Sequence, residues 1–326
     1  MVMHVLRSQG FDFDYLVGAQ IDGFDKMVRL SRKDILVVEG DEYPSSCLDN
    51  RAKMLHYNAT STVITGVAWD HVNIYKTYSD YLGIFDSYVE KLPQESKVFF
   101  DMTDKTLLDL VVEQNYNCER VGYRSLRTDK KGRVIVDDEK YDVKVFGEHN
   151  MKNLNAAMLL CQELDVSPKT FLESIATFTG AAKRLELISE SQTRKIYKDF
   201  AHAPSKVRAT CEAVRGKYQN AHIVGILELH TFSSLRMSFI KHYKGSTVAL
   251  DEVVVFYDPQ ALKQKQLPML DSNAVGVAFA HQNIKVVNTA EALRARLLAI
   301  KESDSDVVLI MSSGNLGGLQ PLPLLD

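Results

Sequence analysis

The chain has 326 residues and carries 39 Lys and Arg against 42 Asp and Glu, for a formal net charge of −3. The length allows about two domains, and 45% hydrophobic with 25% charged residues is a globular composition that excludes a long disordered chain. The weak negative charge gives no general attraction to nucleic acid or anionic membrane, and no apolar run approaches the roughly 20 residues that span a bilayer. We therefore expect no nucleic-acid and no membrane partner.

The four cysteines stand alone in the sequence, at Cys47, Cys118, Cys161 and Cys211. No Cys-x-x-Cys pair is present, which argues against both a disulfide scaffold and a zinc ribbon. Isolated thiols of this kind are typical of a reduced, cytoplasmic protein.

The first half of the chain predicts helices alternating with short buried strands. Residues 1–9 have helical spacing with no N-cap before them, so this is either a frayed terminal helix or a chain that has lost its natural start. Apolar runs predict strands at 15–18, 35–38, 61–65 and 97–100, and helical patterns lie at 81–92 and 106–114. This alternation predicts a mostly parallel α/β sheet.

The pattern changes after Cys118. Residues 118–146 read as short polar strands with a turn at 130–133, which we interpret as a small antiparallel addition at the sheet edge. A helix pair follows at 150–164 and 168–178, with a proline at an early position of the second helix.

A second α/β alternation begins near residue 183, which places a domain boundary at about 180–183. Strands are predicted at 196–200, 223–227, 252–256, 284–287 and 307–311, with helices after Pro204 and at 290–301. We therefore predict two α/β domains, at residues 1–181 and 182–326.

Two acidic or imidazole groups follow predicted strands of the first domain. Glu39 follows the strand at 35–38, and His71 lies beyond the strand at 61–65, next to Asp70. If these strands are neighbours, both side chains face one crevice at the carboxyl ends of the strands, where ligands bind in open α/β sheets. Oxygen ligands there suit Mg²⁺. The alternatives are a solvated acidic loop and a local Asp-His hydrogen bond.

Other polar groups gather where helices begin or strands end. His149, Asn150 and Asn153 open a helix and can hydrogen-bond in both directions, as purine recognition requires; the alternative is a plain Asn cap. Lys183 and Arg184 place two cations at the domain boundary, where an arginine can bind phosphate.

The second domain has three further candidate segments. Asp199 and His202 end a strand and precede a helix, which suits a ribose or substrate contact or a plain N-cap turn. His230, Thr231, Ser312 and Asn315 lie in two loops that also follow strands. Glycines near Asn315 allow close approach to a ligand. Neither G-x-G-x-x-G nor G-x-x-x-x-G-K-[ST] occurs in the chain.

Taken in order, the segments VVEGDEY, Asp70-His71, GEHNMKN, KRLE, DFAHAP and the C-terminal glycine loop resemble the Mur ligase family. The resemblance spans about residues 1–320. Tyr43 and the segment 49–57 are most similar to the branch that joins a tripeptide to UDP-N-acetylmuramate, and the branch that adds L-alanine is the near alternative. The chain departs from the family at Gly66, Ala68, Lys198 and Ala203.

The resemblance implies a central ATPase-type domain with a mostly parallel sheet, followed by a C-terminal Rossmann-like domain. It implies an ATP-dependent, Mg²⁺-requiring ligase of peptidoglycan synthesis or recycling that forms an amide through an acyl phosphate. The implied roles are metal ligands at Glu39 and His71, and a phosphate contact at Arg184. Adenine or nucleotide contacts are implied at His149, Asn150, Asn153, Lys183, Asp199 and His202, and substrate contacts at His230, Thr231, Ser312 and Asn315.

In the family, a UDP-substrate domain and a phosphate-binding loop precede the segment that opens this sequence. We therefore expect a chain truncated at its N-terminus, with little or no ligase activity by itself. Two alternative functions remain open, a metal-dependent hydrolase using Glu39, Asp41, His71 and His149, and a non-catalytic peptide-binding module. The sequence does not indicate the amine substrate or the oligomeric state.

Overall fold

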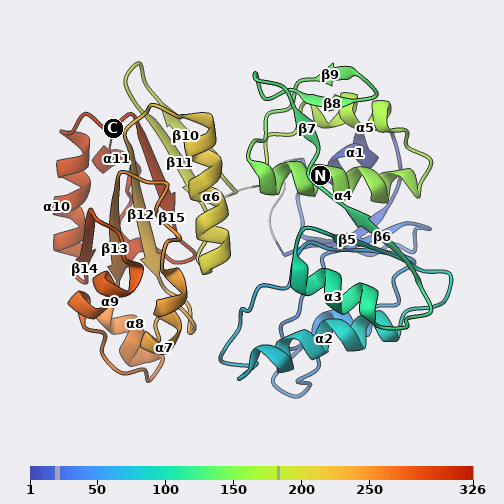
Figure 1. Cartoon of the computed structure of the whole chain (residues 1–326), viewed down its shortest axis with the longest axis horizontal. Coiled ribbons are helices and arrows are strands. Elements are labelled where there is room, and N and C mark those ends of the chain that lie inside the picture. The colour runs from blue at the N-terminus through green and yellow to red at the C-terminus, as the bar shows by residue number, and fades with distance from the viewer. Residues whose placement is uncertain (19–22, 182–183, 326) are drawn as a thin grey trace. The chain divides into compact units, whose positions relative to one another are not determined.

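The computed structural model describes residues 1–18, 23–181 and 184–325. The chain divides into two compact units, Met1–Ala182 and Lys183–Asp326, each with its own sheets and helices (Figure 1). Among the described residues, no helix is long and apolar enough to cross a membrane.

Unit 1 contains three sheets of three strands each. The first has the order β2-β1-β3, the second β4-β5-β6 and the third β7-β8-β9. The strands are β1 (Asp14–Leu16), β2 (Val28–Arg29), β3 (Leu36–Val38), β4 (Ser61–Ile64), β5 (Lys97–Asp101), β6 (Glu119–Tyr123), β7 (Arg127–Thr128), β8 (Val134–Val136) and β9 (Glu139–Tyr141). The pairs β1–β3, β4–β5 and β5–β6 are parallel, whereas β1–β2 and the third sheet are antiparallel.

Two expectations for unit 1 need correction. Strands β3 and β4 belong to different sheets, so Glu39 and His71 do not follow neighbouring strands of one sheet. The segment after Cys118 is not wholly antiparallel either, because β6 extends the parallel sheet and only β7–β9 form an antiparallel sheet of their own. A helix between β5 and β6 makes the β-α-β crossover that parallel pairing requires, and the polar residues of β6 reflect its place at the sheet edge.

The helices of unit 1 follow the predicted pattern. They are α1 (Val2–Ser8), η1 (Lys53–His56), α2 (Tyr78–Glu90), α3 (Lys105–Glu113), α4 (Glu148–Gln162) and α5 (Pro168–Ile175). Thr77 and Asp80 form a reciprocal capping box at the start of α2, and Pro168 occupies the first turn of α5. Helix α1 has no side-chain cap but buries Val5 against α4 and α5 and Leu6 against Phe13 and Tyr15.

Unit 2 is built on one six-stranded sheet with the order β10-β11-β15-β12-β13-β14. The strands are β10 (Glu186–Glu190), β11 (Lys195–Asp199), β12 (Ile223–Leu229), β13 (Glu252–Tyr257), β14 (Ile284–Val287) and β15 (Val307–Met311). All neighbours are parallel except β10, an antiparallel edge strand that the sequence pattern did not predict. This is the open, mostly parallel sheet expected of a Rossmann-like domain.

Helices and short turns surround this sheet. They are α6 (Pro204–Lys217), α7 (Met237–Ile240), η2 (Lys241–Tyr243), α8 (Pro259–Gln264), α9 (Ser272–Phe279), α10 (Ala290–Lys301), η3 (Leu316–Gly318) and α11 (Leu322–Leu325). Strands β12 and β15 are fully buried along their length. Their core partners include Leu293 and Leu297 of α10. The buried central strands therefore set the positions at which the following loops begin.

Candidate functional site

Most of the predicted residues of unit 2 lie at one edge of its sheet. In the register of the parallel strands, Asp199 of β11 and Leu227 of β12 both pair with Met311, the last residue of β15. The loops that follow these three adjacent strands therefore leave the sheet side by side. They contain His202, His230, Thr231, Ser312 and Asn315, at the edge where open α/β sheets bind ligands.

Asp199 is buried and engaged by the protein itself. One carboxylate oxygen accepts from the backbone N–H of Leu185 at 2.6 Å, and the other accepts from the N–H of Ala201 at 2.6 Å. The hydroxyl of Thr210 lies 3.4 Å from the second oxygen. The backbone carbonyl of Asp199 also accepts from the N–H of Ser312 at 3.0 Å. Asp199 therefore holds together the turns on which the neighbouring candidates stand.

Arg184 and His202 flank the aromatic ring of Phe200. The guanidinium carbon of Arg184, an exposed residue, lies 5.5 Å from the Phe200 ring centroid, a cation–π distance. Nδ1 of His202 lies 2.9 Å from the Phe200 carbonyl oxygen, and Tyr243 donates to the His202 carbonyl. Arg184 thus presents a positive charge over the Phe200 ring, which His202 contacts from the same turn. Lys183, predicted beside it, lies outside the described residues.

Glu228, at the end of β12, is a buried carboxylate that the sequence analysis did not single out. Only 1% of the residue is exposed. The Ser312 hydroxyl donates to one of its oxygens, and the backbone N–H of Leu316 donates to the other at 3.0 Å. Nδ1 of His230 lies 3.8 Å from the same carboxylate. Glu228 therefore joins the loop after β15 to the end of β12.

The loop after β15 approaches Glu228 so closely that a side chain at Gly314 would force its neighbours to shift. A Cβ atom on Gly314 would lie 2.7 Å from His230 and 2.8 Å from both oxygens of Glu228. The loop then passes through left-handed conformations at Leu316, Gly317 and Gly318, with φ of 53°, 64° and 83°. A strained loop fixed by a buried carboxylate is a frequent property of ligand-binding sites.

Two of the predicted substrate residues differ in their surroundings. Thr231 is engaged in a local turn, because its hydroxyl donates to Ser234 at 3.0 Å and accepts from the Ser234 backbone N–H at 3.2 Å. Asn315 is exposed beside the left-handed turn. Thr231 therefore shapes its loop, whereas Asn315 presents its amide outward.

In unit 1, the structure pairs His71 with Glu42. Nε2 of His71 lies 3.4 Å from a Glu42 oxygen, and the ring of Tyr43 meets the imidazole edge-on at 4.9 Å between centroids. Glu39 is exposed, and its carboxylate accepts from the backbone N–H of Gly18 at 2.6 Å. The carboxylate beside His71 is therefore three residues beyond the one that the resemblance implied.

The surroundings of Glu42 keep it ionised. Burial alone would raise its pKa, but hydrogen bonding to His71, its own backbone N–H and the Tyr81 hydroxyl lower the pKa to about 2. The Tyr81 hydroxyl donates at 3.1 Å, and the Tyr75 hydroxyl donates to the Glu42 carbonyl. Glu42 lies in the segment VVEGDEY, but the sequence pattern did not show that the distant Tyr75 and Tyr81 would hold it.

His149, Asn150 and Asn153 lie in the first two turns of α4. The helix begins after Gly147, whose φ of 89° suits glycine. The Asn150 side chain donates to the Phe146 carbonyl at 2.8 Å, and Asn153 is half-buried. Within the described parts of the chain, no group of three or more His, Cys, Asp or Glu is arranged to hold a metal.

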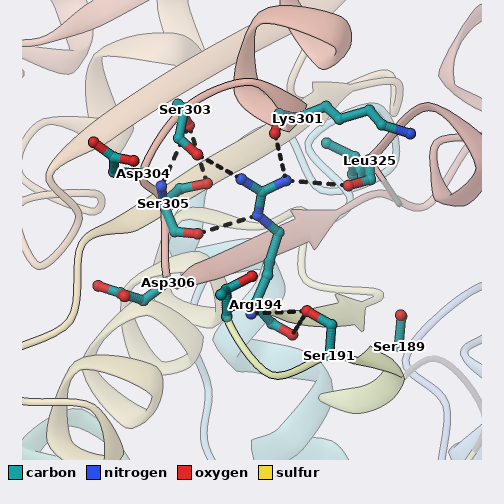
Figure 2. A pocket seen from close by; sticks show the side chains of 10 residues that line it. Ser189, Ser191, Arg194, Lys301, Ser303, Asp304, Ser305, Asp306 and Leu325 are labelled. Atoms are coloured by element: carbon teal, nitrogen blue, oxygen red, sulfur yellow. Dashed lines mark hydrogen bonds between the residues drawn. The ribbon is translucent and has the colours of Figure 1, made fainter.

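A pocket of unit 2 lies away from the candidate site, at the amino ends of β11 and β15. It has a volume of about 680 Å³ and surrounds Arg194 (Figure 2). The Arg194 guanidinium donates to the carbonyls of Lys301, Ser303, Ser305 and Leu325 at 2.7–3.1 Å. The pocket contains none of the predicted residues, and Arg194 serves the fold.

Comparison with known proteins agrees with the resemblance. Residues 183–314 match the family model described as "Mur ligase, glutamate ligase domain". The UDP-N-acetylmuramate–L-alanyl-γ-D-glutamyl-meso-2,6-diaminoheptandioate ligase of Escherichia coli is 26% identical over 98% of this chain and 70% of its own length. A UDP-N-acetylmuramate–L-alanine ligase of Clostridium botulinum is 26% identical over 97% of this chain and 70% of its own length.

Solved structures share the fold. A murein peptide ligase from Psychrobacter arcticus has a TM-score of 0.69 at 17% identity and covers 99% of this chain and 74% of its own. A UDP-N-acetylmuramate–alanine ligase from Thermotoga maritima has a TM-score of 0.65 at 19% identity, over 97% of this chain and 69% of its own. The sequence matches and the shared fold agree with the predicted resemblance: the chain is similar to Mur ligases over nearly its whole length, and residues 183–314 match the family model itself.

Proposed function

We propose that this chain takes part in ATP-dependent amide formation between the carboxylate of UDP-N-acetylmuramate and the amine of L-alanine or of the tripeptide L-alanyl-γ-D-glutamyl-meso-diaminopimelate. One observation supports this most directly: relatives named for these two reactions match 97–98% of the chain. A MurF ligase from Thermotoga maritima, solved with ADP, shares the fold at a TM-score of 0.69 and 14% identity.

The two units would bind different substrates of the reaction. Residues 1–181 would form the ATP-binding domain, with His149, Asn150 and Asn153 toward the adenine. Residues 182–326 would receive the amine substrate at the edge formed by the ends of β11, β15 and β12. The support for this assignment is that the predicted polar residues of unit 2 collect at that edge.

The chemistry requires activation, because a carboxylate is a poor acylating agent in water. A carboxylate oxygen would attack the γ-phosphorus of ATP, giving an acyl phosphate and ADP. The amine nitrogen would then attack the carbonyl carbon, the carbon–oxygen bond to phosphate would break, and the nitrogen would lose a proton. Arg184, exposed above Phe200, would neutralise charge on the transferred phosphoryl group, and the loop tied to Glu228 would position the amine.

A magnesium ion would supply further neutralisation of phosphate charge. The resemblance assigns this ion to Glu39 and His71, but the structure holds Glu39 on the backbone of Gly18 and pairs His71 with Glu42, so the described residues do not form a joint site at Glu39 and His71. Glu42 would orient the His71 ring through the 3.4 Å contact.

A chimeric protein tests the proposal. The N-terminal part of the Escherichia coli relative that this chain does not match would be fused ahead of residue 1. We expect ADP release that depends on both UDP-N-acetylmuramate and an amine substrate. Arg184→Ala should lower kcat/KM of the chimera at least a hundredfold, because such charge-stabilising groups contribute several powers of ten to the rate.

The controls separate folding from function. Arg294→Gln, on α10 and exposed, should leave activity unchanged. A polypeptide limited to the 326 residues has no G-x-x-x-x-G-K-[ST] segment, so we expect no dependent ADP release from it. A folded chimera without dependent ADP release would contradict the ligase proposal, and retained peptide binding would then favour a binding module.

A further inference from the structure

Two buried polar atoms at the candidate edge of unit 2 lack hydrogen-bond partners among the described residues. They are Nε of Arg236, in the loop after β12, and Oγ of Ser313, in the loop after β15. The two loops leave neighbouring strands. A buried polar atom without a partner is unfavourable, so each is a place where a bound ligand can supply the missing partner.

The cations in this region also lack carboxylate partners. Neither Arg236 nor Lys265 forms an ion pair within the described part of the chain. The Lys265 ammonium lies 5.0 Å from the ring centroid of Phe232, which is 38% exposed. Helices α7 and α8, which adjoin Arg236 and Lys265, lie at the same end of unit 2 (Figure 1). The loop after β12 therefore carries the positive charge of Arg236 and the exposed ring of Phe232, and the Lys265 ammonium lies against that ring.

The carboxylates on the same loops are engaged by the protein. Glu228 is buried beneath Ser312 and Leu316. Asp258 caps α8 by accepting from the backbone N–H of Gln260 at 2.8 Å. Neither carboxylate contacts the Arg236 guanidinium or the Lys265 ammonium, so these cations remain available to an anionic ligand.

We infer that Arg236 is a specificity-determining residue that binds a carboxylate of the amine substrate, and that the substrate carries more than one carboxylate. This inference rests on the proposed function. Ser313 offers a hydroxyl to the same ligand, and Lys265 a second positive charge beside Phe232. Arginine pairs with carboxylates through two parallel N–H groups, which gives both strength and orientation.

The charges distinguish the two candidate amines. L-alanine has one carboxylate, adjacent to the amine that reacts. The tripeptide has three: one on the γ-linked D-glutamate and two on diaminopimelate, all remote from the reacting alanine amine. Two cations on different loops, Arg236 after β12 and Lys265 beside the Phe232 ring, match the tripeptide, because a single carboxylate can pair with only one of them.

The test is calorimetric titration of the full chain with three probes: the tripeptide, the same peptide with its three carboxylates amidated, and L-alanine. We expect the tripeptide to bind at least tenfold more tightly than either of the other two. Arg236→Gln should weaken tripeptide binding about tenfold to a hundredfold, the range for losing a charged hydrogen bond. Arg236→Lys should recover part of the affinity.

Arg294→Gln is the matched control, because it removes an exposed arginine from α10 of the same unit, and it should bind like the parent. The amidated peptide tests the charge requirement in the unaltered protein, so the result does not depend on whether a variant folds. If L-alanine binds as tightly as the tripeptide, the inference is wrong and the proposed function stands. If none of the probes binds, the proposed amine site fails as well.

Discussion

Gly314 lies where the loop after β15 meets Glu228 and His230. A Cβ atom there would lie 2.7–2.8 Å from both side chains, closer than Cβ atoms in proteins approach other atoms. We predict that Gly314→Ala destabilises the protein by about 1–3 kcal/mol, the usual cost of overpacking, and weakens tripeptide binding because the loop must move away from Glu228. Urea denaturation measures the first effect and calorimetry the second.

The matched control is Gly216→Ala in α6, where a Cβ atom would meet nothing within 4 Å. Alanine is favoured over glycine within helices by up to about 1 kcal/mol, so this variant should be slightly more stable. A Gly314→Ala protein with unchanged stability would mean that the loop is not held against Glu228 as the structure has it.

At the residue scale, the sequence predicted where several polar residues lie relative to the strands. It placed Asp199, His202, His230 and Ser312 at strand ends, and the structure brings those ends together. It did not single out Glu228, because the partners that bury this residue lie 84 and 88 residues away. Pairing across such separations leaves no local pattern. The carboxylate beside His71 was missed for the same reason.

At the scale of elements, Arg194 ties the β10–β11 hairpin to the end of α10 and to α11. Its guanidinium donates hydrogen bonds to four backbone carbonyls (Figure 2). We predict that Arg194→Met lowers the free energy of unfolding by about 2–4 kcal/mol, because charged hydrogen bonds are lost and the carbonyls lose their donors. Thermal and urea denaturation would measure this loss.

Lys301→Met is the comparison, since this neighbouring side chain points away from Arg194 (Figure 2). An exposed substitution of this kind changes stability by no more than about 0.5 kcal/mol. Equal effects of the two variants would show that the carbonyl contacts of Arg194 contribute little.

Elements with continuous apolar runs were predicted closely. Strands β12 and β15 are buried on both faces, and their runs of Ile, Val and Leu follow from that burial. Strand β10 was missed because it lies at the sheet edge, where its glutamates are exposed. The expectation that β3 and β4 are neighbours was wrong for a different reason: the sequence shows which segments are strands, but pairing depends on contacts between distant segments.

At the scale of the whole molecule, the two units have separate cores. The main core of unit 2 joins Ile196, Val224 and Val254 of the sheet to Leu293 and Leu297 of α10, all within residues 183–326. The family match, at residues 183–314, also lies within this unit. A domain with its own core is expected to fold alone.

We therefore predict that residues 184–326, expressed alone, fold cooperatively and bind the tripeptide within about threefold of the full chain, because Arg236, Lys265 and the Glu228-anchored loop all belong to unit 2. Circular dichroism during heating and calorimetry would measure the two properties. A folded fragment that no longer binds would assign part of the amine site to unit 1. An unfolded fragment would mean that the contacts within unit 2 are too weak without its neighbour, despite a fully buried central pair of strands.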